Sequence, residues 1–358
     1  MRSASCPRFA PRGLLLGLLA VALLGRVTSG VPSQEANKPN AADEIKKESF
    51  EAITTDGVKL VGDFYPSKQG RNAPVVILLH AVGPGKTGAS RKDFGTGASS
   101  LPVLLQKEGY AVLAFDFRGH GDSTGLDDPK TFFFVNPVRG LPPNRLPNRI
   151  EAKDTRLFRS AHDYAKLGND LIAAKEWLNL KNNAGECNST NVVLIGAEQG
   201  AVVGTFWAYG EFIDLKRRKP SGRPEGEDIS AFIWLSMLPR LGVETVELPL
   251  QSAMRAMAEK VPTFAMYGEQ DQQYRSFWDR AIRWIKDERN KERFEATGIK
   301  VIKTNLQGTA MLNKDALKTN DLIIAYLKEF LPQRQWQEQP KMRPPTLFAI
   351  DRLGIPIR

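Results

Sequence analysis

Cysteine is almost absent from this chain of 358 residues, which contains only two. Cys6 lies in an N-terminal segment with the features of a leader peptide, so a processed chain would keep Cys187 alone. A single cysteine excludes an intrachain disulfide, and an exported fold without disulfides depends on its hydrophobic core for stability. A processed chain of roughly 330 residues is long enough to bury such a core.

Long apolar runs are also scarce. The most apolar one, residues 13–25, follows three arginines, ends before Arg26 and is too short to span a bilayer as a helix. A basic start, a short apolar run and small residues after it are typical of a secretory signal peptide, which we assign to residues 1–30. The alternative is an uncleaved membrane anchor. With cleavage we expect an exported protein, periplasmic or secreted, without a further membrane segment.

No strong excess of one charge remains once the leader is removed. The formal net charge of +10 falls by the four arginines of residues 1–30 to +6, and acidic and basic residues are interspersed. The basic run at 216–219 lies in a Pro/Gly-rich loop, which favours a solvated surface over a contact with an anionic one. We therefore expect no nucleic-acid partner. No His, Cys and carboxylate cluster has the spacing of metal ligands, so we expect neither a metal nor a cofactor.

Histidine is scarce as well, since the chain has only His80, His120 and His162. The second half of the chain therefore has no imidazole that could exchange protons near neutral pH. We expect His80 to organise the loop after its strand, His120 to have a structural role, and His162 to lie on the surface. The fold could still bring any of them to a site in the second half.

Short apolar runs that alternate with helical patterns fill most of the remaining chain. The alternation predicts a single-domain α/β fold, with a mostly parallel sheet of eight strands and helices on both faces. Asp56-Gly57 between the first two runs indicates an antiparallel hairpin at the edge of the sheet. The expected strands are 49–54, 58–65, 73–80, 111–116, 191–197, 229–237, 261–267 and 299–303. The expected helices are 101–109, 167–178, 201–208, 248–260, 274–287 and 315–330.

One hydrophobic core accounts for this pattern, so we predict a single domain at 46–331. The polar lead at 31–45 is expected to be disordered after cleavage. Residues 126–160 carry five prolines and three consecutive phenylalanines without a clear period, which indicates an inserted loop that could form a partial lid. The tail at 332–358 is rich in Pro, Gln and Arg, and we expect it to wrap loosely or to be disordered.

The most informative stretch is 191–208, where an apolar, β-branched run leads through Gly196-Ala-Glu-Gln-Gly200 into small and apolar residues. This order predicts a strand, a sharp turn and a buried helix. Glycines two positions before and after Glu198 let the strand and the helix approach closely, because neither glycine has a Cβ. Glu198 is therefore expected in a strained turn.

This stretch resembles the nucleophile elbow Gly-x-Ser-x-Gly of the α/β-hydrolase superfamily, with glutamate in place of serine. Three further motifs follow the order of that family, and the resemblance extends over about residues 49–331. The chain looks most similar to secreted, lysophospholipase-like and serine-aminopeptidase-like members. The three motifs are the apolar strand that ends at His80, the segment 115–123 with Arg-Gly-His-Gly-Asp-Ser, and the segment 267–271.

The resemblance implies a serine at the elbow, an acid after a later strand and a histidine after the last strand. The corresponding positions are Glu198, Asp271 and Gln307, so both nucleophile and base are replaced. The backbone N–H groups of Val82 and Gln199 correspond to the oxyanion donors of the family. Because glutamine neither takes up nor releases a proton near neutral pH, we expect a disabled triad with at most weak residual activity.

Two functions remain open. The first is a non-catalytic exported protein that uses the inherited pocket to bind a small molecule or a protein. The alternative is a hydrolase of ester, amide or peptide bonds with Glu198 as a carboxylate nucleophile. In the first case the buried carboxylate requires compensation of its charge. We expect an arginine or lysine, a bound cation, or several backbone N–H groups beside it.

Two other motifs have simpler interpretations. Residues 83–88 match Gly-x-Gly-x-x-Gly after a strand, and Asp116 ends the next strand, as in dinucleotide-binding folds. Polar residues and more glycines follow where that motif requires a helix to begin, so we reject a nucleotide site. Asn188-Ser-Thr190 fits a glycosylation acceptor, which matters only in a eukaryotic secretory route.

Overall fold

The computed structural model describes most of the chain from residue 45 onwards. The described residues are 45–138, 140–142, 144–154, 156–213, 225–285, 296–340, 349–350 and 356–357. The expected signal peptide and the lead up to residue 44 lie outside them, as does the basic run at 216–219. Within the described part, no helix combines the length and the apolar character needed to cross a bilayer.

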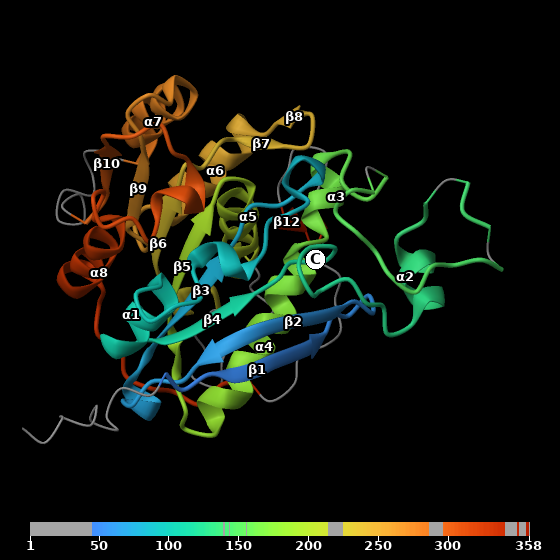
Figure 1. Cartoon of the computed structure of the whole chain (residues 1–358), viewed down its shortest axis with the longest axis horizontal. Coiled ribbons are helices and arrows are strands. Elements are labelled where there is room, and N and C mark those ends of the chain that lie inside the picture. Colours follow the sequence, from blue (N-terminus) through green and yellow to red (C-terminus); the bar gives the residue numbers. More distant parts are fainter. Residues whose placement is uncertain are drawn as a thin grey trace, which may run out of the picture. The chain divides into compact units, whose positions relative to one another are not determined.

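A sheet of eight strands forms the centre of the fold (Figure 1). Its order is β1-β2-β4-β3-β5-β6-β9-β10, with β2 antiparallel to both β1 and β4 and all other neighbours parallel. The edge hairpin and the mostly parallel, eight-stranded sheet are thus confirmed. The strands are β1 (Glu48–Ile53), β2 (Lys59–Tyr65), β3 (Pro74–Leu79), β4 (Ala111–Phe115), β5 (Asn188–Ala197), β6 (Ile229–Leu235), β9 (Thr263–Gly268) and β10 (Gly298–Ile302).

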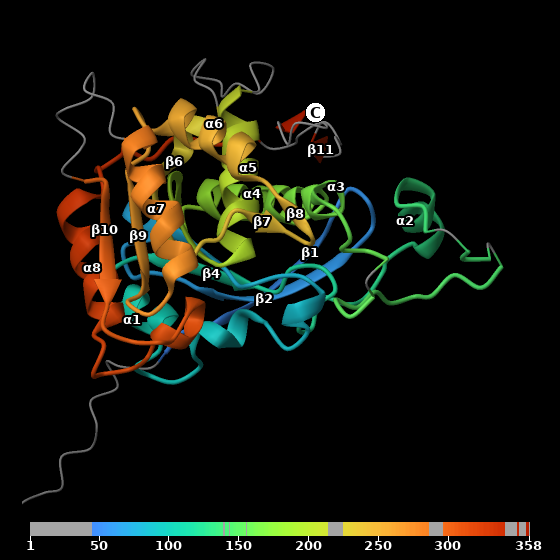
Figure 2. The same cartoon turned by 90° about the horizontal axis from the view of Figure 1, so that it is seen from above.

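Helices cover both faces of the sheet, as the alternating pattern predicted. In Figure 2, α1 lies on one side of the strands and α4 and α5 lie on the other. Buried residues of α1 and α8 share one hydrophobic cluster, and those of α4 to α7 share the other. The helices are α1 (Leu101–Lys107), α2 (Pro129–Val135), α3 (Ala161–Ala165), α4 (Gly168–Asn183), α5 (Gln199–Ile213), α6 (Glu247–Met257), α7 (Gln272–Ile285) and α8 (Thr319–Phe330). Short strands pair as β7 (Arg240–Leu241) with β8 (Glu244–Thr245) and as β11 (Ala349–Ile350) with β12 (Pro356–Ile357).

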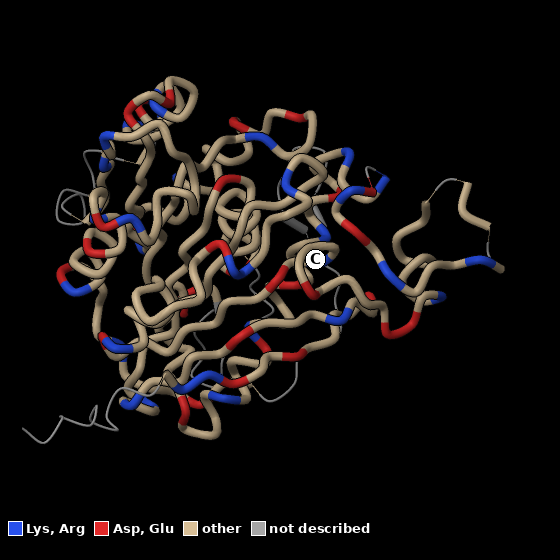
Figure 3. The backbone as a smooth tube through the Cα atoms, viewed as in Figure 1, with Lys and Arg blue, Asp and Glu red and all other residues tan. Residues whose placement is uncertain are grey.

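Charged residues of both signs are interspersed along the described chain (Figure 3). One cation is buried in the core, where Arg118 lies between Asp56 and Asp170 with nitrogen–oxygen distances of 2.5 and 2.7 Å. Burial alone would raise the pKa of Asp56, but the adjacent guanidinium lowers it to about 2. This ion triad ties the loop after β4 to the edge hairpin and to α4.

The central strand β5 is longer than the apolar run that predicted it. All ten residues are buried, including Asn188, Ser189 and Thr190 ahead of the expected start at 191. Their side chains are hydrogen-bonded within the protein, so the strand continues through residues that a hydropathy pattern leaves out. The expected start of this strand is therefore wrong by three residues.

The inserted segment 126–160 contains the helix α2, which its irregular pattern did not indicate. The side chain of Asp128 accepts a hydrogen bond from the Lys130 N–H, and a proline occupies the first turn. Phe132 is buried, whereas Phe134 is 88% exposed. The helix has only seven residues, so the segment offers too short a window for a helical period to be recognised.

Residues 332–340 have neither helix nor strand, yet they are held in place. Side chains from α4 and β5 bind this segment through its backbone, as where the Asn191 Nδ2 donates to the Pro332 carbonyl oxygen at 2.9 Å. The expectation of a loose or disordered tail is wrong for these nine residues. Side-chain amides can form hydrogen bonds with the backbone carbonyl groups of a segment that has no secondary structure. The periodicity of the sequence does not predict such contacts.

Candidate functional site

The turn between β5 and α5 has the geometry of a nucleophile elbow. Glu198 adopts a left-handed backbone conformation with φ of +50°, which is strained for a residue with a side chain. A Cβ on Gly196 would come within 2.7 Å of the Ala201 Cα, and a Cβ on Gly200 would clash with the His80 carbonyl oxygen. Close approach therefore requires both glycines, as their spacing predicted.

The Glu198 carboxylate is almost buried and has a cationic partner. Glu198 is 9% exposed, and its Oε2 lies 2.6 Å from the Nζ of Lys86, at the end of the 3₁₀ helix η3 (Pro84–Lys86). The carboxylate also follows β5 directly at the N-terminus of α5, where the helix dipole favours a negative charge. The expectation of a lysine or arginine beside this carboxylate is confirmed, and Lys86 is that residue.

Sequence analysis did not identify Lys86 as part of this site. It lies in residues 83–88, whose glycines suggest a nucleotide-binding loop rather than a partner for Glu198. Two 3₁₀ helices, η3 and η4 (Arg91–Phe94), follow β3 where that motif would need an α-helix, which supports the rejection of a nucleotide site. A single lysine in a loop carries no spacing signal that pairs it with a residue so distant in the chain.

Asp271 and Gln307 come together beyond the carboxyl ends of β9 and β10. The Gln307 Nε2 donates a hydrogen bond to the Asp271 Oδ2. The two side chains are paired as an acid and a histidine would be, but the amide has no proton to exchange near neutral pH.

Gly308 brings this loop against the elbow. Its φ is +53°, and a Cβ at this position would lie 2.9 Å from the Glu198 Oε1. The Gly308 N–H donates to the Ser236 Oγ at 2.9 Å, and Ser236 is itself in a left-handed conformation with φ of +50°. The loop after β10 is thus tied to the residue that follows β6, close beside the Glu198 carboxylate.

His80 is fully buried just beyond the end of β3, and both of its ring nitrogens contact the backbone. Nδ1 lies 2.7 Å from the Ala81 carbonyl oxygen, and Nε2 accepts a hydrogen bond from the Phe117 N–H at 3.0 Å. Burial, and then the charge of His120, lower the pKa of His80 to about 3. His80 is therefore a neutral imidazole that donates from Nδ1 and connects two loops, as expected.

His120 and His162 also have the positions expected of them. The His120 Nε2 accepts a hydrogen bond from the Gly83 N–H at 3.1 Å, and its Nδ1 lies 2.9 Å from the Arg118 carbonyl oxygen. Burial lowers the pKa of His120, so this ring is neutral as well. His162 is exposed on α3. The two buried imidazoles thus have no ring nitrogen left for Glu198.

A pocket of about 570 Å³ opens above Glu198. It is lined by the loop after β3 on one side, by the loop after β10 on the other, and by Glu198. Among the described residues of 126–160, none lines this pocket, so the insert does not act as its lid in this structure. The lining side chains that carry polar groups are Lys86, Asp93, Glu198, Asn305, Gln307 and Thr309.

Two further ionisable groups respond to the charge of Glu198. Burial raises the pKa of Asp93, and the negative charges of Asp116 and Glu198 add to this effect. Burial also raises the pKa of Tyr274, with further contributions from Glu198 and Asp271. The Tyr274 hydroxyl therefore stays protonated at neutral pH.

Two backbone N–H groups are expected to act as oxyanion donors. That of Gln199 follows Glu198 in the elbow, and that of Val82 lies in the loop after β3. Gln199 is the first residue of α5, and Val82 is buried in the loop that follows β3. Within the described part of the chain, neither N–H has a hydrogen-bond acceptor. Both donors are therefore uncommitted, which an oxyanion role requires.

The sequence model of the alpha/beta hydrolase family matches residues 76–349. The match covers most of the chain, and the chain therefore belongs to the alpha/beta hydrolase family.

Comparison with solved structures finds proteins similar to this chain. An esterase from Pyrococcus furiosus is 18% identical, with a TM-score of 0.45 over 80% of this chain and 92% of that one. A dienelactone hydrolase from Anabaena variabilis is 15% identical, with a TM-score of 0.47 over 80% of this chain and 99% of that one. A search of curated proteins finds no match.

Proposed function

We propose that this protein is an exported member of the alpha/beta hydrolase family without serine-type hydrolase activity, whose pocket binds a small molecule or a protein. The observation that carries the proposal is the ion pair of Glu198 with Lys86 at the elbow. The contact of Gln307 with Asp271 adds to it. Export rests on the pattern of residues 1–30, and recovery of a chain that begins near residue 31 outside the cytoplasm would test it.

Serine-type hydrolysis requires a hydroxyl at the elbow and a base that accepts its proton. Glu198 has no hydroxyl, and Gln307 cannot accept a proton. The Lys86 ammonium is held by the carboxylate as its counter-ion, so it is not a base either. The hydroxyl and the base of the proton path are thus both missing, while the acid Asp271 is present.

The alternative hydrolase would use the Glu198 carboxylate as its nucleophile. Attack on the carbonyl carbon of the substrate would form a mixed anhydride and release the alcohol or amine. A base would then have to activate water to hydrolyse that anhydride. The Lys86 ammonium stabilises the carboxylate and so reduces its nucleophilicity. The neutral, committed rings of His80 and His120 do not supply the base.

The proposed ligand is polar. The pocket presents Lys86, Asp93 and Glu198 together with the side chains of Asn305 and Gln307. Such a lining offers both donors and acceptors, and an apolar acyl chain would leave them unpaired at a cost. A ligand with several hydroxyl, amide or charged groups fits it better.

An assay with a chromogenic short-chain ester tests the lost activity. The unaltered protein is expected to hydrolyse the ester no faster than buffer does, because nucleophile and base are both missing. Glu198→Ser combined with Gln307→His should raise the rate by at least about tenfold, since the acid and the oxyanion donors remain available. Steady-state hydrolysis at pH 7 to 8 measures both.

Glu198→Ser alone is the matched control, because it restores the hydroxyl without the base. We expect it to stay near the unaltered rate. Turnover by the unaltered protein that disappears in Glu198→Ala would contradict the proposal and would favour the carboxylate nucleophile instead.

A further inference from the structure

The C-terminal segment 332–340, here called the strap, crosses the C-terminal end of α4 and the start of β5 without forming a helix or a strand. Five side chains, here called the amide groove, each donate a hydrogen bond to a different carbonyl group of the strap. Asn191 donates to Pro332, Asn188 to Arg334, Thr190 to Gln335, Asn182 to Gln337 and Asn183 to Gln339, at distances of 2.8 to 3.0 Å. The groove therefore binds the backbone of the strap at five of its nine residues.

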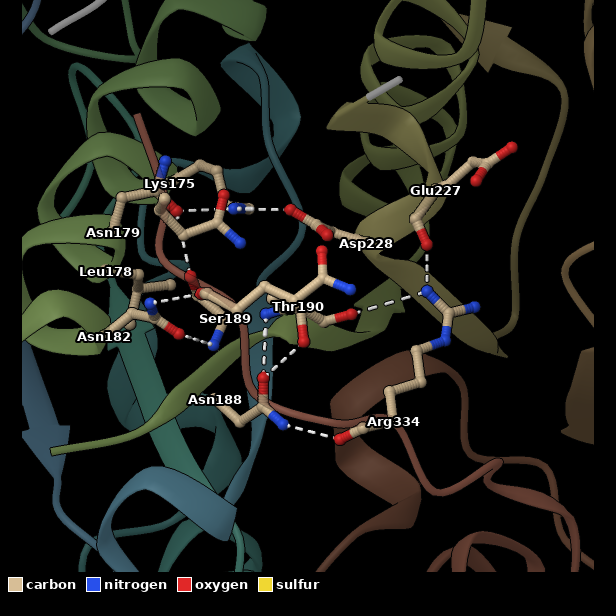
Figure 4. Close-up of polar contacts among 12 residues, drawn as sticks. Lys175, Leu178, Asn179, Asn182, Asn188, Ser189, Thr190, Glu227, Asp228 and Arg334 are labelled. Carbon is tan, nitrogen blue, oxygen red and sulfur yellow. Dashed lines mark hydrogen bonds and ion pairs between the residues drawn. The ribbon is translucent and has the colours of Figure 1, made fainter. Parts of the chain in front are cut away.

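Buried polar contacts within the domain fix the orientation of groove side chains (Figure 4). The Asn188 Oδ1 accepts a hydrogen bond from the Thr190 N–H, and the Asn182 Oδ1 accepts one from the Ser189 N–H. Asn182, Asn188 and Asn191 are each no more than 1% exposed. Because the amide oxygens of Asn182 and Asn188 are used inside the domain, the N–H groups of these two side chains are directed at the strap.

Two strap side chains add specificity to this backbone recognition. The Arg334 guanidinium donates to the carbonyl oxygens of Glu227 and Ile229, next to the start of β6. The Trp336 indole N–H donates to the Asn182 carbonyl oxygen at 3.1 Å, and its ring lies 4.7 Å from the guanidinium carbon of Arg71.

A third strap side chain, Gln339, is 1% exposed, so it too is enclosed by the protein. Its side-chain nitrogen and oxygen have no hydrogen-bond partner among the described residues. The strap side chains with specific contacts are therefore Arg334 and Trp336, in the pattern Arg-x-Trp.

We propose that the amide groove is a binding site for peptides with this pattern, and that the strap is its ligand in cis. All five groove donors belong to the folded domain and contact only the backbone of the strap. Recognition therefore does not depend on the covalent connection at Leu331. A peptide with the strap sequence binds the same groove in trans whenever the strap is displaced.

This site also explains the glycosylation-like motif at 188–190. The Asn188 Nδ2, to which a glycan would be attached, is buried and donates to the Arg334 carbonyl oxygen at 2.8 Å. A glycan at Asn188 and a docked strap exclude each other. In the folded protein this asparagine is a groove residue and not a modification site.

The proposal is tested with a fluorescently labelled peptide of residues 332–340 and the full-length protein. Arg334→Ala with Trp336→Ala weakens the strap and leaves every groove donor in place. Fluorescence anisotropy should show that this variant binds the peptide at least tenfold more tightly than the unaltered protein, whose groove is occupied. A peptide with alanine in place of both its arginine and its tryptophan should not compete. Failure of the strap-weakened variant to bind, while its unfolding stays cooperative, would overturn the proposal.

A second measurement does not depend on that variant. Trypsin should cleave after Arg334 slowly in the unaltered protein and at least tenfold faster in Asn188→Asp, which replaces a groove donor by an acceptor. Asn144→Asp, the same change at an exposed residue of the insert, is the control and should leave the rate unchanged. Equal cleavage rates in Asn188→Asp and the control would show that the groove does not hold the strap.

Discussion

The residue that decides the chemistry is Glu198, and its nearest ionic partner is Lys86. At 2.6 Å, with one side chain mostly enclosed and the other 37% exposed, the pair is intermediate between a surface and a buried ion pair. The strained backbone at Glu198 is retained even though no serine is present. The elbow therefore still delivers a side chain into the pocket, and that side chain is a neutralised carboxylate.

Replacing Lys86 by methionine keeps the bulk of the side chain and removes its charge. We expect the free energy of unfolding to fall by about 1 to 2 kcal/mol, because the Glu198 carboxylate loses its counter-ion while remaining shielded from water. Urea denaturation at pH 7 measures the loss. In a Glu198→Gln background the same replacement should cost less than about 0.5 kcal/mol. Equal losses in both backgrounds would mean that the ion pair does not contribute.

At the scale of elements, buried polar contacts fix the positions of helices and strands relative to one another. Apolar contacts are less directional and do not do this by themselves. The Lys175 Nζ on α4 lies 3.1 Å from the Asp228 Oδ2 at the start of β6, and both residues are nearly fully buried (Figure 4). The same Nζ contacts the Asn179 Oδ1, which accepts a hydrogen bond from Ser189 of β5. This network fixes α4 against two central strands and supports the amide groove.

Lys175→Met should lower the free energy of unfolding by about 3 to 5 kcal/mol, because Asp228 then keeps its buried charge without this cation. Chemical denaturation is the measurement. Adding Asp228→Asn removes the charge, and the double variant should recover a large part of the loss. If the double variant is less stable than Lys175→Met alone, the charge of Asp228 is satisfied mainly by other contacts.

At the scale of the whole molecule, two neutral buried histidines make stability depend on pH. His80 and His120 have folded-state pKa values below the ordinary value of about 6.5, and that of His80 is about 3. Below pH 6.5 the unfolded chain binds protons that the folded chain does not. Their contribution to stability is therefore complete above about pH 6.5 and is lost as the pH falls toward 3.

The free energy of unfolding should consequently decrease between pH 6 and 4.5, by up to about 1.4 kcal/mol per pH unit for each histidine. Urea titrations at several pH values measure this slope. His80→Gln should reduce this slope, because His80 has the large pKa shift. Asp56 does not contribute in this range, since its contribution is lost only below about pH 4. Asp170 opposes the slope, because burial raises its pKa to about 6 and the folded chain then binds a proton there before the unfolded chain does. A slope that His80→Gln leaves unchanged would contradict the assignment of His80 as buried and neutral.

Short-range features of the sequence sufficed to predict the sheet and the elbow. Alternating apolar runs report which face of an element is buried, and the glycines at 196 and 200 report a close approach within one turn. All three histidines precede Asp271, so the sequence offers no histidine after it as a candidate base. These features are local or compositional, so they do not depend on how the chain is arranged in space.

Tertiary structure alone decided which distant residues meet. Lys86 joins Glu198, and the tail joins Asn188, which is 146 positions away from Arg334. The ring nitrogens of His80 and His120 are committed to loops rather than to the site. Each of these contacts is a single pair of side chains that are far apart in the sequence. Neither composition nor residue spacing indicates which two residues will pair. The partners come within reach only when the backbone is folded.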